Sequence, residues 1–134
     1  MTLPHHSLIA WQRADDLFIH LHKVSHTFPA EEKFEVASQL RRAAFSVAVN
    51  IVEGFGRDGD KEKLHLLHIA SSSLAEAGYC LHAAKRLGYL NQKEYEVLEL
   101  EVRQVAAPLR GLMKSVGKKA PFSRVGRTRP PQAT

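Results

Sequence analysis

The chain contains one cysteine, Cys80, so it has no internal disulfide framework. A lone thiol fits a reducing compartment, and the sequence predicts a cytoplasmic protein. No apolar run approaches the ~20 residues that span a bilayer. The first residues lack the cationic start and apolar stretch of a secretory leader. We therefore expect neither a membrane-spanning segment nor a signal peptide.

Acidic residues are missing from the last eighteen residues, 117–134. This segment carries five cations, which are Lys118, Lys119, Arg124, Arg127 and Arg129. Residues 1–116 hold equal numbers of acidic and basic residues, so the whole net charge of +5 lies in this segment. Because it is also rich in Pro and Gly, we expect a globular domain of residues 1–116 followed by a basic, disordered tail.

Alternating strand patterns are absent as well, and the segments of residues 1–116 have the period of a helix. The first two helices are expected at residues 7–27 and 29–55. The third should begin after Asp60 as N-cap and end before Gly88 as C′ residue. The fourth should open with a capping box from Asn91 to Glu94 and bend at Pro108. The sequence thus predicts an all-α, antiparallel up-down-up-down four-helix bundle.

The second helix is apolar around most of its circumference, more than a surface helix requires. We expect it to bury one face in its own core and another in a partner. The residues expected at an oligomer interface are Phe45, Val49, Val52 and Phe55.

A narrow polar line remains on this helix, formed by Arg42, Ser46, Asn50, Glu53 and Arg57. The line is either a network of ion pairs and hydrogen bonds along or between helices, which we favour, or a strip that lines the inner surface of an assembly or contacts RNA phosphates. Arg41 lies nearer the apolar face and is expected to pair with an acid, for which Glu76 is one candidate.

Gly78 falls in the middle of the third helix, where glycine costs roughly 1 kcal/mol relative to alanine. A close approach by a bulky neighbour would explain it, and Trp11 is a candidate.

Catalytic and metal-binding patterns are also missing. Glu62-x-x-His65 is half of the pair of motifs that a di-iron bundle needs, so no metal site is expected. Cys80 is predicted to be a buried structural thiol. Ser71–Ser73 lie in mid-helix without the glycine turn of a nucleophile elbow. We therefore expect no enzyme activity, no catalytic residue and no cofactor.

Two runs, Gln39–Val47 and Asn50–Arg57, resemble the signature of the four-helix bundle proteins encoded in intervening sequences of bacterial 23S ribosomal RNA genes. Trp11-Gln12, Phe28-Pro29 and Leu87-Gly88-Tyr89 support the resemblance, which covers about residues 8–116. It implies an up-down bundle that assembles into a homo-oligomer, commonly a pentameric ring, without established enzyme activity. A distantly similar architecture is that of the accessory protein of diversity-generating retroelements, a basic ring that binds nucleic acid and a reverse transcriptase.

Together these observations predict a non-catalytic homo-oligomer that associates with RNA. The residues expected to contact nucleic acid are Arg41, Arg42 and Arg57 together with the five cations of the tail. The alternative is a protein–protein adaptor, such as an accessory subunit of a reverse transcriptase.

Overall fold

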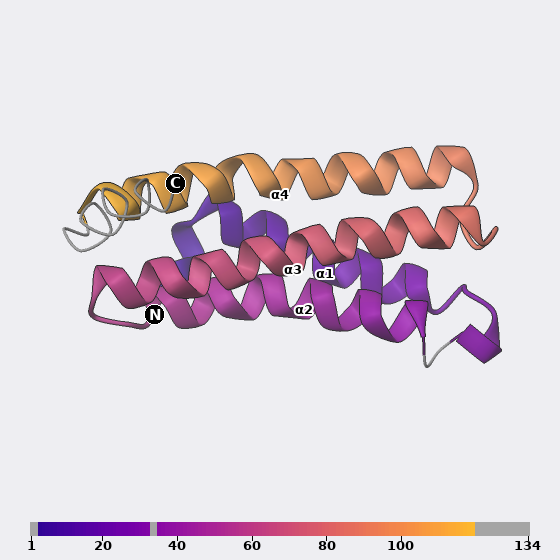
Figure 1. Cartoon of the computed structure of the whole chain (residues 1–134), viewed down its shortest axis with the longest axis horizontal. Coiled ribbons are helices and arrows are strands. Elements are labelled where there is room, and N and C mark those ends of the chain that lie inside the picture. The colour runs from indigo at the N-terminus through magenta and orange to yellow at the C-terminus, as the bar shows by residue number, and fades with distance from the viewer. Residues whose placement is uncertain (1–2, 33–34, 120–134) are drawn as a thin grey trace, which may run out of the picture.

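The computed structural model describes residues 3–32 and 35–119, which form four α-helices and two short 3-10 helices. The α-helices are α1 (Ile9–Ser25), α2 (Val36–Phe55), α3 (Asp60–Arg86) and α4 (Gln92–Lys119). They lie along one axis, and short connections join them at the two ends of the bundle (Figure 1). The described residues contain no strand, so the all-α, four-helix prediction is confirmed.

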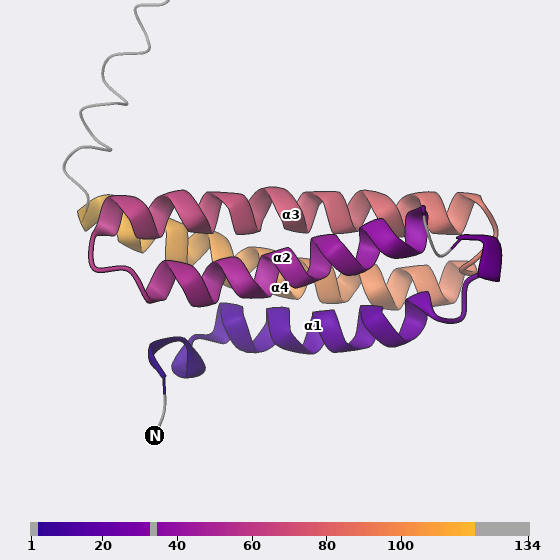
Figure 2. The same cartoon turned by 90° about the horizontal axis from the view of Figure 1, so that it is seen from below.

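Each helix packs mainly against two others. α1 and α3 both contact α2 and α4, so that α2 and α4 occupy opposite corners of the bundle (Figure 2). A single apolar core fills the space between the helices, and its largest fully buried side chains include Leu17, Leu40, Leu67 and Leu109. No helix among the described residues is both long enough and apolar enough to cross a bilayer.

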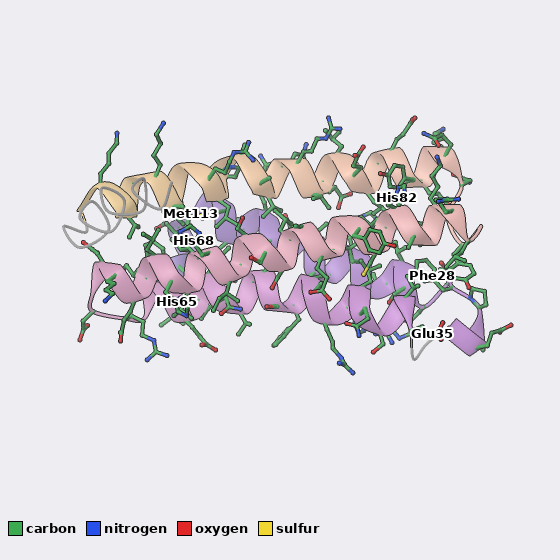
Figure 3. The ribbon with its side chains drawn as sticks, viewed as in Figure 1. Phe28, Glu35, His65, His68, His82 and Met113 are labelled. Carbon is green, nitrogen blue, oxygen red and sulfur yellow. The ribbon has the colours of Figure 1, made fainter. Side chains whose placement is uncertain are left out.

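The first two helices begin later than expected. A 3-10 helix (Pro4–Ser7) precedes α1, and another (Ala30–Glu32) occupies the place predicted for the start of α2. The amide of Gln39 makes the first helical hydrogen bond of α2, to the carbonyl of Glu35. Pro29 therefore opens only one short turn. Phe28 is buried beside Tyr89 at the end of the bundle, which anchors this connection to the one between α3 and α4 (Figure 3).

The end of α3 and the start of α4 have the expected caps, whereas the N-cap predicted for α3 is wrong. The N-cap of α3 is Gly59 and not Asp60, because the amide of Lys63 donates to the Gly59 carbonyl. At the other end Gly88 has φ +85°, and the amides of Gly88 and Tyr89 donate to Lys85 and Ala84 in a Schellman arrangement.

The predicted capping box of α4 is confirmed. The Asn91 amide donates to Glu94 Oε1, and the Glu94 amide donates to Asn91 Oδ1, each at 2.8 Å. α4 runs through Pro108 without a break and ends at Lys119. Gly117, Lys118 and Lys119 thus belong to the helix, and the rest of the predicted tail lies outside the described residues.

The expected contact of Trp11 with Gly78 does not occur. A Cβ added at Gly78 would meet nothing within 4 Å. Trp11 instead packs against the rings of His5 and His6, with centroid separations of 4.7 Å and 5.4 Å. Trp11 thus lies against the N-terminal 3-10 helix, and the space beside Gly78 is open.

These two glycines predict opposite effects of the same substitution. Gly88→Ala should lower the free energy of unfolding by about 1 kcal/mol or more, because an L-residue is strained at this positive φ. Gly78→Ala should raise it by about 0.5–1 kcal/mol, because alanine restricts the unfolded chain and finds free space in the helix. Urea unfolding followed by circular dichroism, at one fixed protomer concentration, measures both. A loss of stability in Gly78→Ala would show that a neighbour does crowd this position.

Candidate functional site

An apolar strip lies on the surface of α2. We define the α2 outer face as Phe45, Val49 and Val52. Phe45 is 54% exposed, and Val49 and Val52 are half-buried. The only ring packed against Phe45 among the described residues is that of Phe18 on α1, at a centroid separation of 5.6 Å. Three of the four residues expected at an oligomer interface therefore form one apolar surface.

Phe55, the fourth predicted interface residue, lies apart from this strip. It is half-buried and packs against the core of its own chain. The ammonium of Lys63 lies 5.5 Å from the centroid of its ring. Phe55 thus joins the end of α2 to the start of α3.

The middle of the polar line on α2 is a hydrogen-bond network between α2 and α3. Asn50 Nδ2 donates to the Ser46 carbonyl at 2.8 Å and to Ser46 Oγ at 3.0 Å. Ser73 Oγ, which comes from α3 and is buried, donates to Ser46 Oγ at 2.7 Å. For Ser46 and Asn50 the interpretation as an internal network is correct.

The charged members of the line behave differently. Arg42, Glu53 and Arg57 are exposed, and their side chains make no ion pair with any described residue. The three charges are therefore solvated and accessible on the surface of α2.

Arg41 does not pair with Glu76. Its guanidinium Nη1 donates to Ser25 Oγ at 2.7 Å, across the contact of α2 with α1. Ser25 is buried and donates in turn to the carbonyl of His22. Arg41 is half-buried in this arrangement, so it fixes the packing of α1 on α2.

The remaining basic candidates lie at the chain's end. Lys118 is exposed near the C-terminus of α4, and Lys119 is the last residue of that helix. Arg124, Arg127 and Arg129 lie outside the described residues.

His20 lies in a contact between α1 and α4. No role was predicted for it from the sequence. His20 Nδ1 lies 2.8 Å from Glu101 Oε2 and 2.9 Å from Oε1. The two residues are 81 positions apart in the chain, so no local pattern could reveal the pair.

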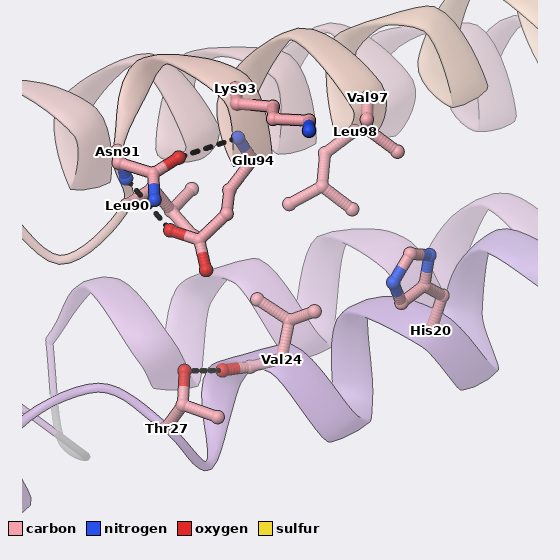
Figure 4. Close-up of a pocket in the computed structure, with 9 residues that line it drawn as sticks. All are labelled: His20, Val24, Thr27, Leu90, Asn91, Lys93, Glu94, Val97 and Leu98. Carbon is pink, nitrogen blue, oxygen red and sulfur yellow. Dashed lines mark hydrogen bonds between the residues drawn. The ribbon is translucent and has the colours of Figure 1, made fainter.

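A hollow of about 340 Å³ opens beside this pair, between the end of α1 and the start of α4 (Figure 4). Its floor is apolar, with Val24, Leu90 and Leu98. The Glu94 carboxylate at its rim is held by the capping box. The hollow offers no nucleophile beside a base, so it gives no support to a catalytic reaction.

The histidines of α3 do not assemble a metal site. His65 and His68 are exposed on that helix (Figure 3). Within residues 3–32 and 35–119, no group of three or more His, Cys, Asp or Glu side chains is placed to hold a metal ion.

Cys80 is buried in the core, with 7% of its surface exposed. Burial raises the pKa of its thiol, and the nearby carboxylate of Glu76 raises it further. Both causes disfavour the thiolate, which is the reactive form.

Comparison with known proteins gives a family and a fold. The model of the family described as 23S rRNA-intervening sequence protein matches residues 6–111. A similar solved structure is that of a protein of unknown function from the S23 ribosomal protein family of Bacteroides thetaiotaomicron. It has a TM-score of 0.74 and 18% identity, and the match covers 79% of this chain and 99% of that chain. A search of curated proteins found no significant match.

The environment of Cys80 predicts slow alkylation. At pH 8 the folded chain should react with iodoacetamide at least about tenfold more slowly than the chain unfolded in urea, because burial and Glu76 keep the thiol protonated and covered. The rate should keep rising with pH beyond the ordinary pKa of a thiol. Intact-mass measurement over time follows the reaction, and equal rates in the two states would contradict the assigned burial.

Proposed function

We propose a function from one premise, which is that the chain belongs to the 23S rRNA-intervening sequence protein family. In this proposal it is a non-catalytic, up-down-up-down four-helix bundle of the cytoplasm. It assembles into a homo-oligomer, a pentameric ring, and associates with RNA. The observation that supports the assembly best is the exposed Phe45 of the α2 outer face.

Assembly through α2 is supported by where the helix places its bulky side chains. Phe45 is a large aromatic residue left mainly in water, and Val49 lies one turn further along the same side. An aromatic side chain surrounded by aliphatic residues is typical of the central part of a protein interface. Arg42 and Glu53 flank the strip and would supply its polar rim.

A ring requires that this face meets a different surface of the next copy. Such a head-to-tail contact closes into a ring when the rotation between neighbours divides a full turn. Five copies are the number that the family resemblance implies.

RNA association is supported by charge. The +5 net charge comes from the C-terminal segment, whose Arg124, Arg127 and Arg129 have no acidic neighbours in sequence. Arg42 and Arg57 are exposed on α2 and add to this group. Arg41 is the weakest of the predicted RNA contacts, because its guanidinium already binds Ser25.

The assembly predicts the behaviour of one substitution. Phe45→Asp should give smaller particles with unchanged helix content, because a carboxylate buried in an interface without a partner costs several kcal/mol. Mass photometry or light scattering measures the particle, and circular dichroism measures the helix. Leu100→Asp on α4 is the matched control, because Leu100 is 55% exposed and Phe45 is 54% exposed.

The control variant should keep the mass of the wild type. If Phe45→Asp also keeps it, the α2 outer face is not the contact between copies. The strip is then free for a different protein, and the adaptor function, with a reverse transcriptase as one partner, becomes the better proposal.

RNA binding through the tail has its own test. Replacing Arg124, Arg127 and Arg129 with Gln in the full chain should reduce the log–log slope of affinity against salt by about 2 on single-stranded RNA, because each lost phosphate contact removes about 0.7. The control carries three Gln at exposed cations elsewhere, Lys23, Arg86 and Lys93. An equal change in both variants would point to general electrostatic attraction without a role for the tail.

A further inference from the structure

The acidic residues of the chain stop at Glu101, in the first half of α4. Residues 102–134 hold eight Lys and Arg and no Asp or Glu, whereas the first 101 residues hold eleven bases and fourteen acids. The boundary between the two kinds of charge therefore lies inside a described helix. This boundary lies sixteen residues before the basic segment 117–134, in which the sequence analysis placed the whole net charge.

Four cations after this boundary share one side of the helix. We define the α4 basic face as Arg103, Arg110, Lys114 and Lys118, all of which are exposed. At 100° per residue they fall within an arc of about 80°, and they extend over about 22 Å of helix. Figure 3 shows side chains with nitrogen tips projecting from the outer side of α4.

Contacts within the chain explain only part of this row. Arg103 pairs with Glu99 at 3.4 Å. Lys118 also has an interaction of its own. Arg110 and Lys114 make no ion pair with any described residue. These two exposed cations are available to an outside anion.

The surface between the cations permits a close approach. Ala107 lies in the middle of the row, and Gly111 lies at its edge. Both are exposed, and a Cβ added at Gly111 would meet nothing within 4 Å. A rigid anionic surface can therefore come near the helix backbone without displacing a bulky side chain.

The same face has no aromatic platform on which an unpaired base could stack. The part of α4 after Glu101 contains no aromatic residue. Single-stranded nucleic acid is commonly held by aromatic platforms, whereas double-stranded RNA is recognised by its shape and its backbone. A row of cations along one helix suits the second form.

We propose that the α4 basic face binds the phosphate backbone of double-stranded RNA. The proposal rests on the proposed function of RNA association, and it specifies the protein surface and the form of RNA that it binds. α2 and α4 stand at opposite corners of the bundle, since each packs mainly on α1 and α3. The α2 outer face and the α4 basic face of one copy are therefore separate surfaces, so a partner on the first does not by itself cover the second.

The test is a double charge reversal in the full chain, Arg110→Glu with Lys114→Glu, and the probe is a short RNA duplex of mixed sequence. At about 0.1 M salt the affinity should fall at least about tenfold, and the log–log salt slope should shrink by about 2. The control, Lys23→Glu with Lys93→Glu, makes the same change of charge at two exposed cations outside this face. It should stay within about threefold of the wild type.

Each variant is first checked for the helix content and particle mass of the wild type. If the Glu pair fails this check, Arg110→Gln with Lys114→Gln replaces it, and a smaller loss of affinity, still larger than that of the control, supports the proposal. Equal affinities of the α4 variant and its control overturn the proposal. If only the Gln variant of Arg124, Arg127 and Arg129 then loses binding, the proposed function stands without this surface.

Two further results would also overturn the proposal. One is tighter binding of the matching single strand than of the duplex, and the other is binding of anionic lipid vesicles without binding of RNA. A wild-type chain that binds no RNA of either form at low salt contradicts both this inference and the RNA-associated function.

Discussion

The close packing of α2 against α3 is the constraint on which the rest of the structure depends. Gly54, which is buried on α2, allows the two helices to approach closely. A Cβ added at Gly54 would lie 3.4 Å from the Cβ of Leu66 and from the carbonyl of Lys63. α3 also has small buried residues, which are Ala70, Ser73, Ala77 and Ala84.

This packing decides which side of α2 faces water. Because the inward side uses alanine and glycine beside Leu40, Val47 and Ile51, the aromatic Phe45 has no place in the core. It stays on the outer face with Val49 and Val52. The hydroxyl contact between Ser46 and Ser73 fixes the rotation of α2 further, since a turned helix would leave the buried Ser73 without its acceptor. One interface inside the chain thus positions the surface proposed for assembly.

Much of this fold follows from local sequence chemistry. The capping box of Asn91 and Glu94 and the positive φ of Gly88 depend on residues within one turn, so the sequence alone was enough to predict them. The late start of α2 was missed because Pro29 fits the first turn of either kind of helix. The contact of His20 with Glu101 joins residues far apart in the chain and needs the assembled bundle.

The candidate surfaces, too, could be predicted only in part from the sequence. Helical periodicity identified Phe45, Val49 and Val52 as surplus apolar residues. Phe55 was predicted at the interface with them, although it lies on the core side of the helix and packs against the core and Lys63. Charge was assigned to the tail because proline and glycine mark a segment boundary at residue 117. Net charge over residues 1–116 is zero, and this balance concealed the change from acidic to basic side chains within α4.

In the proposed assembly, RNA binding by α4 depends on the contact between copies through α2. An exposed cation contributes little to binding at physiological salt, because mobile ions screen it within about 8 Å. A single α4 basic face offers few phosphate contacts, and its affinity for RNA should be low. A ring repeats that face once per copy, and each contact after the first is made at a high effective concentration if the RNA reaches the next copy. The apolar strip on α2 would then set the strength of RNA binding without touching RNA, because it sets the number of basic faces presented together.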